Sequence, residues 1–447
     1  AKSLSPVEAT RALLARIERH DADLKAFCLV ATEQAQAEAR RSEERWRLGV
    51  PRGRLDGVPV AIKDLLLTKG WPTLRGSRTI DPDRPWDEDA PAVARLREHG
   101  AILIGKTTTP EFGWKGVTDS PLTGITRNPW DPTRTPGGSS GGAAVALAAG
   151  MTTLALGTDG GGSIRIPAGF TGVFGLKPTF GRVPAYPPSP FGTLAHVGPM
   201  TRSVTDAALL LGVICEADRR DVQALPTEGT DYLQGLDDGI KGRRIAFSPT
   251  LGGHPVDPEV AVLVGAAARR FEELGAHVEE AEPPLPDCAG VFRIHWFAGA
   301  ANLLSGFRRK QKSLIDPGLV EIAREGARLK LLDYLAAVRQ REAIALVMSR
   351  FHETYDLLLT PSLPIPAFEA GLERPPGSAE GRWVDWTPFS YPFNLTRQPA
   401  ASVPCGLTEA GLPVGLQIVG PLHEDGRVLR AARAFERLRP FAMPDID

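Results

Sequence analysis

The chain contains 447 residues with a formal net charge of −1; 42% of the residues are hydrophobic and 23% are charged. This composition is typical of a globular protein with a large buried core, and the near-neutral charge argues against nucleic acid or an anionic membrane as a direct partner. The four cysteines form no C-x-x-C pair and the eight histidines form no H-E-x-x-H motif. We therefore expect no disulfide framework, no metal and no other cofactor. Scattered cysteines also fit a reducing compartment, so we expect a cytoplasmic protein.

The first element that the sequence predicts is an amphipathic helix near the N-terminus. Ser5 can act as its N-cap, Pro6 suits the first helical position, and Glu8 completes a capping box. This start differs from a secretory signal, which combines a basic segment with an apolar one. The chain begins at Ala1 rather than Met, which leaves open whether a leader was removed.

Farther along the chain, apolar runs of strand length alternate with patterns of helical periodicity. We predict strands over 58–62, 101–104, 244–247, 356–360, 400–404 and 414–419, the last two paired with each other. We predict helices over 90–99 with Asp89 as N-cap, over 258–274, over 319–355 with one break, and over 424–438, and a proline-rich loop from Val278 onward. This alternation favours a layered α/β architecture.

Two loops rich in proline and glycine, at 181–192 and 375–381, are candidate domain boundaries. The candidate site described next draws on residues between 63 and 165. Because one site spans so much of the chain, we expect residues 1–447 to form a single domain.

Two clusters of glycine and serine are the most informative feature of the chain. Residues 137–142 read Gly-Gly-Ser-Ser-Gly-Gly, and residues 159–165 read Asp-Gly-Gly-Gly-Ser-Ile-Arg. The alanine-rich segment 143–150 between them is long enough for about two helical turns. Glycine allows a backbone to approach a ligand closely, exposed N–H groups can hold a developing oxyanion, and serine is a candidate nucleophile. The uncharged stretch 135–158 is too small and polar in character for a transmembrane helix.

Two motif matches in this region are misleading. Residues 100–107 fit the pattern of a phosphate-binding loop, but the interval is itself an apolar strand that follows a helix. Residues 138–142 fit the G-x-S-x-G pattern of a nucleophile elbow, which requires an apolar strand directly before it. The preceding residues 128–136 are interrupted by prolines and cannot form a central strand. We therefore disfavour both a nucleotide site and an α/β-hydrolase triad.

Lys63, Ser139 and Ser163 are the candidates for chemistry. Lys63 ends an apolar run, and a lysine at a strand end more often extends to solvent or pairs with a neighbour such as Asp64. If it is buried without a partner, its pKa falls from about 10.4 and the neutral amine can accept a proton. Ser163 is either a helix N-cap or a nucleophile, and the Ser139 hydroxyl can pass a proton because it both donates and accepts. For Arg165 we expect a structural ion pair.

The residues around these candidates resemble one known family. Segments 57–64, 137–142 and 159–168 look like the motifs of the amidase signature family of serine hydrolases. The similarity covers nearly the whole chain and extends over 101–107, 128–130, 175–179, 399–404 and 412–417. The resemblance implies an α/β fold with a large mixed β-sheet sandwiched between helices on both faces.

The resemblance also implies a Ser–cis-Ser–Lys triad. Ser163 would attack the amide carbonyl and form an acyl-enzyme, Ser139 would relay the proton, and Lys63 would be the general base. The peptide bond between Gly138 and Ser139 is expected to be cis. Gly113 matches a position where the backbone touches substrate. The oxyanion donors are expected at Gly160, Gly161, Gly162 and Ser163.

The expected partner is a small-molecule amide, hydrolysed to an acid and ammonia or an amine, and a homodimer is left open. One branch of the family is the A subunit of the glutamyl-tRNA(Gln)/aspartyl-tRNA(Asn) amidotransferase, which releases ammonia from glutamine and needs a partner subunit. Its tyrosine-rich helix is absent around 332–355, so we favour a stand-alone amidase. A non-catalytic, glycine-rich anion-binding protein is the alternative from another class. The aromatic stretch 383–393 fits an apolar acyl or aryl pocket, but an ordinary core cluster is the more frequent role.

Overall fold

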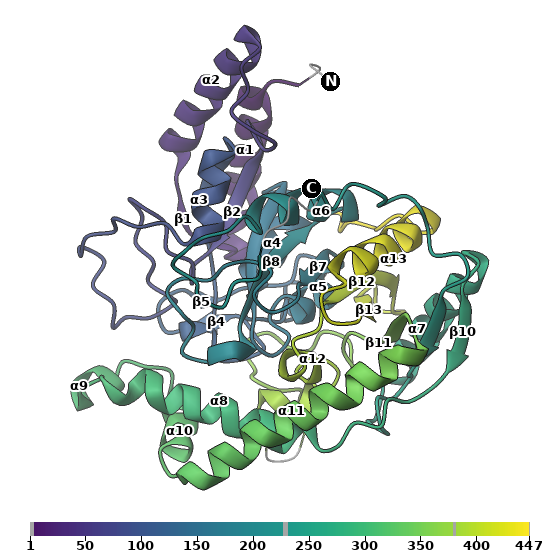
Figure 1. Ribbon diagram of the computed structural model, residues 1–447. Coiled ribbons are helices and arrows are strands. Elements are labelled where there is room, and N and C mark those ends of the chain that lie inside the picture. Colours follow the sequence, from purple (N-terminus) through teal and green to yellow (C-terminus); the bar gives the residue numbers. More distant parts are fainter. Residues whose placement is uncertain (1–3, 227–230, 379–380, 447) are drawn as a thin grey trace.

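An eleven-stranded β-sheet runs through the computed structural model, which describes residues 4–226, 231–378 and 381–446 (Figure 1). Its strands are β1 (Phe27–Val30), β2 (Pro59–Lys63), β3 (Ile102–Thr107), β6 (Leu154–Asp159), β7 (Phe174–Lys177), β8 (His196–Thr201), β9 (Arg244–Phe247), β10 (His277–Glu280), β11 (Leu357–Pro361), β12 (Ala400–Leu407) and β13 (Pro413–Val419). A separate pair consists of β4 (Asp119–Ser120) and β5 (Gly124–Ile125).

The sheet is mixed. From edge to edge, its strands follow the order β1-β3-β2-β6-β8-β7-β12-β13-β11-β9-β10. β2 lies parallel to β3 and β6 in one half, and β9 lies parallel to β10 and β11 in the other. Antiparallel pairs connect the two halves, including β12 with β13, which confirms the pairing predicted for these two strands.

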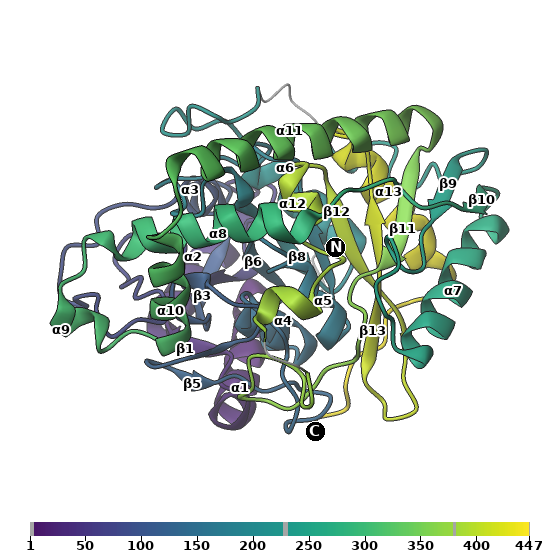
Figure 2. The same ribbon diagram turned by 90° about the horizontal axis from the view of Figure 1, so that it is seen from below.

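Helices cover both faces of the sheet, as the family resemblance implied. They are α1 (Pro6–Leu24), α2 (Thr32–Leu48), α3 (Pro91–Glu98), α4 (Gly141–Ala148), α5 (Arg165–Thr171), α6 (Val204–Ile214), α7 (Pro258–Glu273), α8 (Cys288–Ser305), α9 (Arg309–Lys312), α10 (Pro317–Gly326), α11 (Leu331–Thr354), α12 (Pro392–Leu395) and α13 (Asp425–Leu438). One face packs against α3, α6, α7 and α13, and the other against α1, α2, α4 and α5. Outside the second face, α8 and α11 lie side by side (Figure 2).

Strand β2 shows why the sheet is so apolar at its centre. Val60 and Ile62 join the core beneath α3 and α6, whereas Ala61 between them joins the core beneath α4. Side chains of a strand alternate between faces, so a strand covered on both sides reads as one continuous apolar run. Lys63 is the last residue of this run and is as buried as the residues before it.

Most predicted elements are confirmed. Ser5 caps α1, with the complete capping box that the sequence indicates. The predicted break within 319–355 separates α10 from α11. The short alanine-rich helix between the glycine clusters is α4.

Two local predictions are wrong. Asp89 is not the N-cap of α3, because Ala90 occupies that position. The Asp89 carboxylate instead accepts the Lys69 backbone N–H at 2.7 Å and pairs with Arg97 at 3.0 Å. Val278 itself lies not in a loop but in β10, which pairs with β9 at an exposed edge of the sheet and therefore lacks an apolar pattern. The predicted proline-rich loop begins only at Ala281 and runs to Asp287.

The two loops considered as domain boundaries have different places in the structure. The loop 181–192 forms one wall of the pocket described below. The loop 375–381 includes residues 379–380, which lie outside the described residues. A single domain stays a prediction. Among the described helices, none combines the length and the apolar character needed to span a membrane.

Candidate active site

The Lys63 amine lies among three hydroxyl groups at the carboxyl end of β2. Its Nζ atom is 2.7 Å from Ser139 Oγ, 2.8 Å from Ser140 Oγ and 2.9 Å from Thr158 Oγ1. The Lys63 side chain has 0% relative exposure. Strand β2 thus carries the amine directly to the first glycine–serine cluster, with neutral partners around it.

Burial lowers the pKa of Lys63 well below its usual range, and the negative charge of Asp159 offsets this effect only in part. Desolvation disfavours the charged form of an amine when no carboxylate pairs with it. A neutral amine carries a lone pair that can accept a proton, whereas an ammonium group can only donate. The structure therefore meets the burial condition that the sequence analysis set for a lysine base.

Ser140 and Thr158 orient the amine. The Ser140 hydroxyl donates its one hydrogen to the Thr158 carbonyl at 3.1 Å and accepts the Thr158 backbone N–H at 3.2 Å. Ser140 Oγ can then only accept from Lys63 Nζ, and Thr158 Oγ1 accepts a second N–H. A neutral amine has two N–H groups, so its lone pair is left facing the Ser139 hydroxyl. Sequence analysis missed both residues, although Ser140 stands next to Ser139.

Backbone contacts hold the two glycine–serine clusters together. The Ser140 N–H donates to the Ser163 carbonyl at 3.0 Å. The peptide bond between Gly138 and Ser139 is cis, as the resemblance implied. Ser139 and Ser163 line the same pocket. Among the described residues, no hydrogen bond joins their two hydroxyls, so the direct link from Ser139 in this structure runs to Lys63.

Asp159 and Arg165 form the buried ion pair that fixes the second cluster. Arg165 donates to both carboxylate oxygens of Asp159 at 3.0 Å, and both side chains have no exposed surface. Although burial opposes it, the Arg165 guanidinium holds the pKa of Asp159 well below its usual range. Arg165 also donates to the Ser390 carbonyl at 2.8 Å and to Asn394 at 2.7 Å. The structural ion pair expected for Arg165 is confirmed.

The backbone N–H groups of the second cluster divide into two sets. The Gly162 N–H donates to the Asp159 carboxylate at 2.7 Å, so this predicted oxyanion donor is already engaged. Within the described part of the chain, the N–H groups of Gly160, Gly161 and Ser163 have no acceptor. These three groups are the ones free to receive a negatively charged oxygen.

Gly113 borders the Ser139 hydroxyl. The φ angle of Gly113 is +72°, and that of the preceding residue, Phe112, is +52°. A Cβ atom on Gly113 would lie 2.8 Å from Leu65 Cδ1 and 3.4 Å from Ser139 Oγ. Only glycine satisfies both the backbone conformation and the space here. The structure thus brings Gly113 to the pocket lining together with Ser139, Gly160 and Ser163, whereas Lys63, Gly161 and Gly162 do not line it.

We expect Gly113→Ala to lower kcat/KM by about 10- to 100-fold, because the new methyl group displaces Leu65 or the Ser139 hydroxyl by part of an ångström. Steady-state kinetics on a para-nitroanilide would measure the loss. Gly411→Ala is the matched control, since Gly411 also has a positive φ but open space around it. The control variant should lose about 1 kcal/mol of stability and keep its activity. Equal kinetic effects in the two variants would contradict this role of Gly113.

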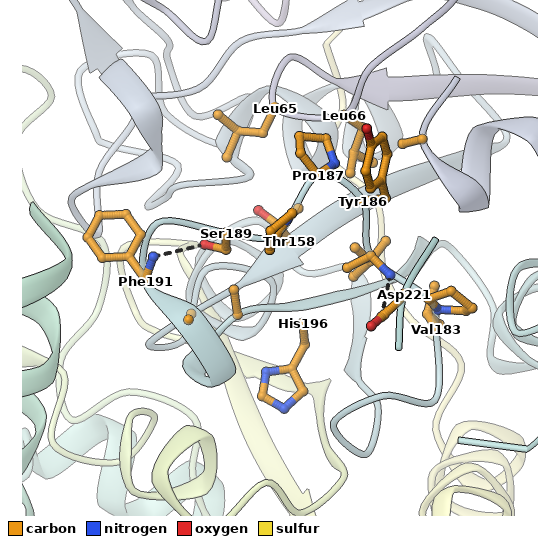
Figure 3. A pocket seen from close by; sticks show the side chains of 18 of the residues that line it. Leu65, Leu66, Thr158, Val183, Tyr186, Pro187, Ser189, Phe191, His196 and Asp221 are labelled. Atoms are coloured by element: carbon orange, nitrogen blue, oxygen red, sulfur yellow. Dashed lines mark hydrogen bonds between the residues drawn. The ribbon is translucent and has the colours of Figure 1, made fainter. Parts of the chain in front are cut away.

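The pocket above these residues has a volume of about 410 Å³ (Figure 3). Ser139, Ser163 and the glycines at 113 and 160 form its polar floor. Its walls are largely apolar and aromatic: Leu65, Leu66, Phe112, Val183, Tyr186, Pro187, Phe191 and Trp296. Phe191 stacks on Trp296 with ring centroids 3.7 Å apart. The pocket can therefore receive the hydrocarbon part of an organic amide.

The aromatic stretch 383–393 lies behind this wall rather than in it. Trp383 and Tyr391 are buried and pack against Phe292 of α8. Neither residue lines the pocket. The stretch is a core cluster, which was the more frequent of the two roles considered.

The match of residues 100–107 to a phosphate-binding loop has no structural counterpart. Most of the interval is strand β3. The Lys106 amine is fully buried and donates to the Leu66 carbonyl at 2.7 Å and to Thr73 Oγ1 at 2.8 Å. Lys106 therefore ties β3 to the loop that follows β2 and has no exposed amine for a phosphate.

Comparison with known proteins decides the family. The family model described as Amidase matches residues 8–429. The chain belongs to the amidase signature family. It is 38% identical to an acylamidase of Rhodococcus erythropolis over 451 residues, which cover 99% of this chain and 94% of that protein. It is also 38% identical to the A subunit of the glutamyl-tRNA(Gln) amidotransferase of Myxococcus xanthus over 476 residues, which cover 99% and 95% of the two chains.

Solved structures of the amidase signature family agree with this assignment. A bacterial aryl acylamidase superposes with a TM-score of 0.91 and 33% sequence identity, over 98% of this chain and 94% of that one. The protein is therefore an amide-hydrolysing enzyme, and the family assignment favours this function over a non-catalytic anion-binding role. The near-equal similarity to two branches leaves the particular reaction to be argued from the site.

Proposed function

We propose that the protein is a stand-alone amidase in which Ser163 is the nucleophile, Ser139 the proton relay and Lys63 the general base. The observation that carries the proposal is the 2.7 Å contact between the buried Lys63 amine and Ser139 Oγ, in a pocket that Ser163 also lines. A base placed within hydrogen-bond reach of a hydroxyl is the arrangement that activates a serine.

In the proposed reaction one proton passes from Ser163 through Ser139 to Lys63. Rotation of the Ser163 hydroxyl toward Ser139 lets its proton pass to Ser139 as the Ser139 proton passes to Lys63, while Ser163 Oγ bonds to the amide carbon. The carbonyl oxygen becomes an oxyanion that the free N–H groups of Gly160, Gly161 and Ser163 can stabilise. The ammonium of Lys63 then returns the proton through Ser139 to the leaving amine. Water hydrolyses the resulting ester by the same route.

The apolar pocket walls favour, as the substrate, an amide with an apolar or aryl group rather than glutamine. Free glutamine carries an α-ammonium group, which calls for a carboxylate partner. Asp221 is the acidic side chain among the described lining residues. Its oxygens already accept the backbone N–H groups of Ala185 at 2.8 Å and Gln223 at 2.9 Å. The aryl acylamidase among the structural neighbours agrees with this preference.

Covalent labelling tests the proposed nucleophile. A fluorophosphonate probe reacts with an activated serine, and peptide mapping by mass spectrometry then locates the adduct. We expect one adduct, on Ser163, in the wild-type chain. An adduct on another serine, or no adduct in a chain that hydrolyses anilides, would refute the assignment.

The amidotransferase subunit remains the second candidate because of the 38% identity to one such protein. The two functions differ in what the isolated chain does. A stand-alone amidase hydrolyses a para-nitroanilide by itself. Glutaminase activity that requires a co-purifying partner, without anilide hydrolysis by the chain alone, would favour the amidotransferase.

A further inference from the structure

Arg75 is a charged residue of the pocket that the proposed chemistry does not use. It lines the pocket and is half-buried. No acceptor among the described residues receives a hydrogen bond from its guanidinium group, and none of their carboxylates forms an ion pair with it. Burial lowers the pKa of Arg75, and Arg84 nearby adds a second positive charge. A desolvated cation without a partner is unfavourable unless a ligand supplies the anion.

The backbone around Arg75 holds it in a defined position. Its φ angle is +55°, a conformation uncommon for residues other than glycine. The Arg75 carbonyl accepts the Phe112 N–H at 2.8 Å, next to the turn that carries Gly113. The Asp64 carboxylate accepts the Gly76 N–H at 3.3 Å and lies 3.6 Å from Lys106 Nζ. Asp64 therefore secures the turn through backbone N–H. Its negative charge offsets the lowering of the Arg75 pKa only in part, and it forms no hydrogen bond or ion pair with the guanidinium among the described residues.

The other ionised lining groups already have partners. Arg220 pairs with Asp218 at 2.7 Å and stacks over the Tyr186 ring at 5.1 Å. Asp221 accepts two backbone N–H groups, as described above. Among the described lining residues, Arg75 is thus the one permanently charged group left without a partner.

We propose that Arg75 binds a carboxylate of the substrate, so that the enzyme prefers amides whose acyl or amine part carries a carboxylate. The guanidinium presents parallel N–H groups that match the two carboxylate oxygens. The apolar walls bind the hydrocarbon between that carboxylate and the amide. This inference rests on the proposed function, because it assumes that the amide reacts at Ser163.

Two substrate pairs test the proposal and locate the carboxylate. On the acyl side, the mono-para-nitroanilide of glutaric acid is compared with the anilide in which a methyl ketone replaces the carboxylate. On the amine side, para-acetamidobenzoate is compared with para-acetamidoacetophenone. Each pair keeps the size of the molecule and removes only the charge.

In one of the two pairs, wild-type kcat/KM for the carboxylate should exceed that for the ketone by about 10- to 100-fold. Arg75→Gln should abolish this preference and change kcat/KM for the ketone by less than about threefold. Arg75→Lys should retain part of the preference. Arg78→Gln is the matched control, because Arg78 is an exposed arginine outside the pocket lining and its loss should leave the preference unchanged.

The proposal is overturned if neither pair shows a preference, or if Arg75→Gln keeps the preference of the wild type. If Arg75→Gln does not fold, the inhibition constants of the charged and uncharged products are measured for the wild-type enzyme instead. The charged product should inhibit more strongly, and equal inhibition constants overturn the proposal. Failure of the proposed function gives a different result from failure of the Arg75 proposal: the wild type would then hydrolyse neither member of either pair through Ser163.

Discussion

Ser163→Ala is expected to lower kcat/KM on a para-nitroanilide by roughly 10⁴- to 10⁶-fold, because the acyl-enzyme can no longer form. The fold should survive the change. Ser163 has 3% relative exposure, and its carbonyl, which accepts from the Ser140 N–H, is unaffected by the substitution. Residual turnover would come from binding and from the backbone N–H groups of Gly160, Gly161 and residue 163, which the substitution keeps.

The measurement combines steady-state kinetics, fluorophosphonate labelling and thermal unfolding. Ser189→Ala is the matched control: Ser189 lines the same pocket and accepts the Phe191 N–H at 3.2 Å (Figure 3). The control should keep its activity within about threefold and still be labelled. If Ser163→Ala keeps more than about one hundredth of wild-type activity, Ser163 is not the nucleophile.

The parts of the site that sequence reasoning reached are those with a local chemical signature. Lys63 ends an apolar run, and a strand covered on both faces buries its last residue as well. An ion pair was expected for Arg165, and in the structure its partner is Asp159, which stands six residues earlier in the chain. The signature motifs then implied the mixed sheet, which the strand order confirms.

The parts that it missed depend on contacts between distant segments. Thr158 acts as a partner of Lys63 only because β6 lies beside β2 in the sheet. Arg75 attracts notice only once the pocket exists and its other charged residues are seen to be paired. The Gly162 N–H reads as an oxyanion donor in the motif, yet the Asp159 carboxylate three residues earlier takes it. Local pattern cannot decide such competition between partners.

The prediction of secondary structure failed at three places for similar reasons. Helix α8, for which the sequence analysis predicted no element, mixes Arg293 and Asn302 with apolar residues and packs against both α10 and α11, so no clear amphipathic stripe marks it. Asp89 has the side chain of an N-cap, but a backbone N–H from another loop and Arg97 compete for it. β10 is an exposed edge strand with two glutamates, so its sequence lacks the apolar pattern that predicts a strand.

Lys63→Met is expected to lower kcat/KM by roughly 10²- to 10⁴-fold, because the methionine side chain fills a similar space but cannot accept a proton. Wild-type activity should fall as the pH drops through the lowered pKa of Lys63, since protonation removes the lone pair that faces Ser139. The residual activity of the variant should lack this acid limb. Lys106→Met, which replaces a buried lysine outside the pocket lining, should keep it.

Protein stability gives a second, independent measure of the same buried amine. In the unfolded chain Lys63 titrates near 10.4, whereas in the folded chain its pKa is lowered. Between these two values the unfolded state binds more protons than the folded state, so the free energy of unfolding rises with pH, by about 1.4 kcal/mol per pH unit for one proton. Above both values this dependence ends.

Lys63→Met removes that pH dependence. The variant also leaves the hydroxyls of Ser139, Ser140 and Thr158 without their partner, which lowers its stability by an amount that does not change with pH. The slope and the offset are therefore separable in urea unfolding curves recorded from about pH 6 to pH 9. The stability of the wild type relative to the variant should increase steadily over this range. Parallel pH curves would mean that the folded protein keeps Lys63 protonated, and a protonated amine cannot be the base that activates Ser163.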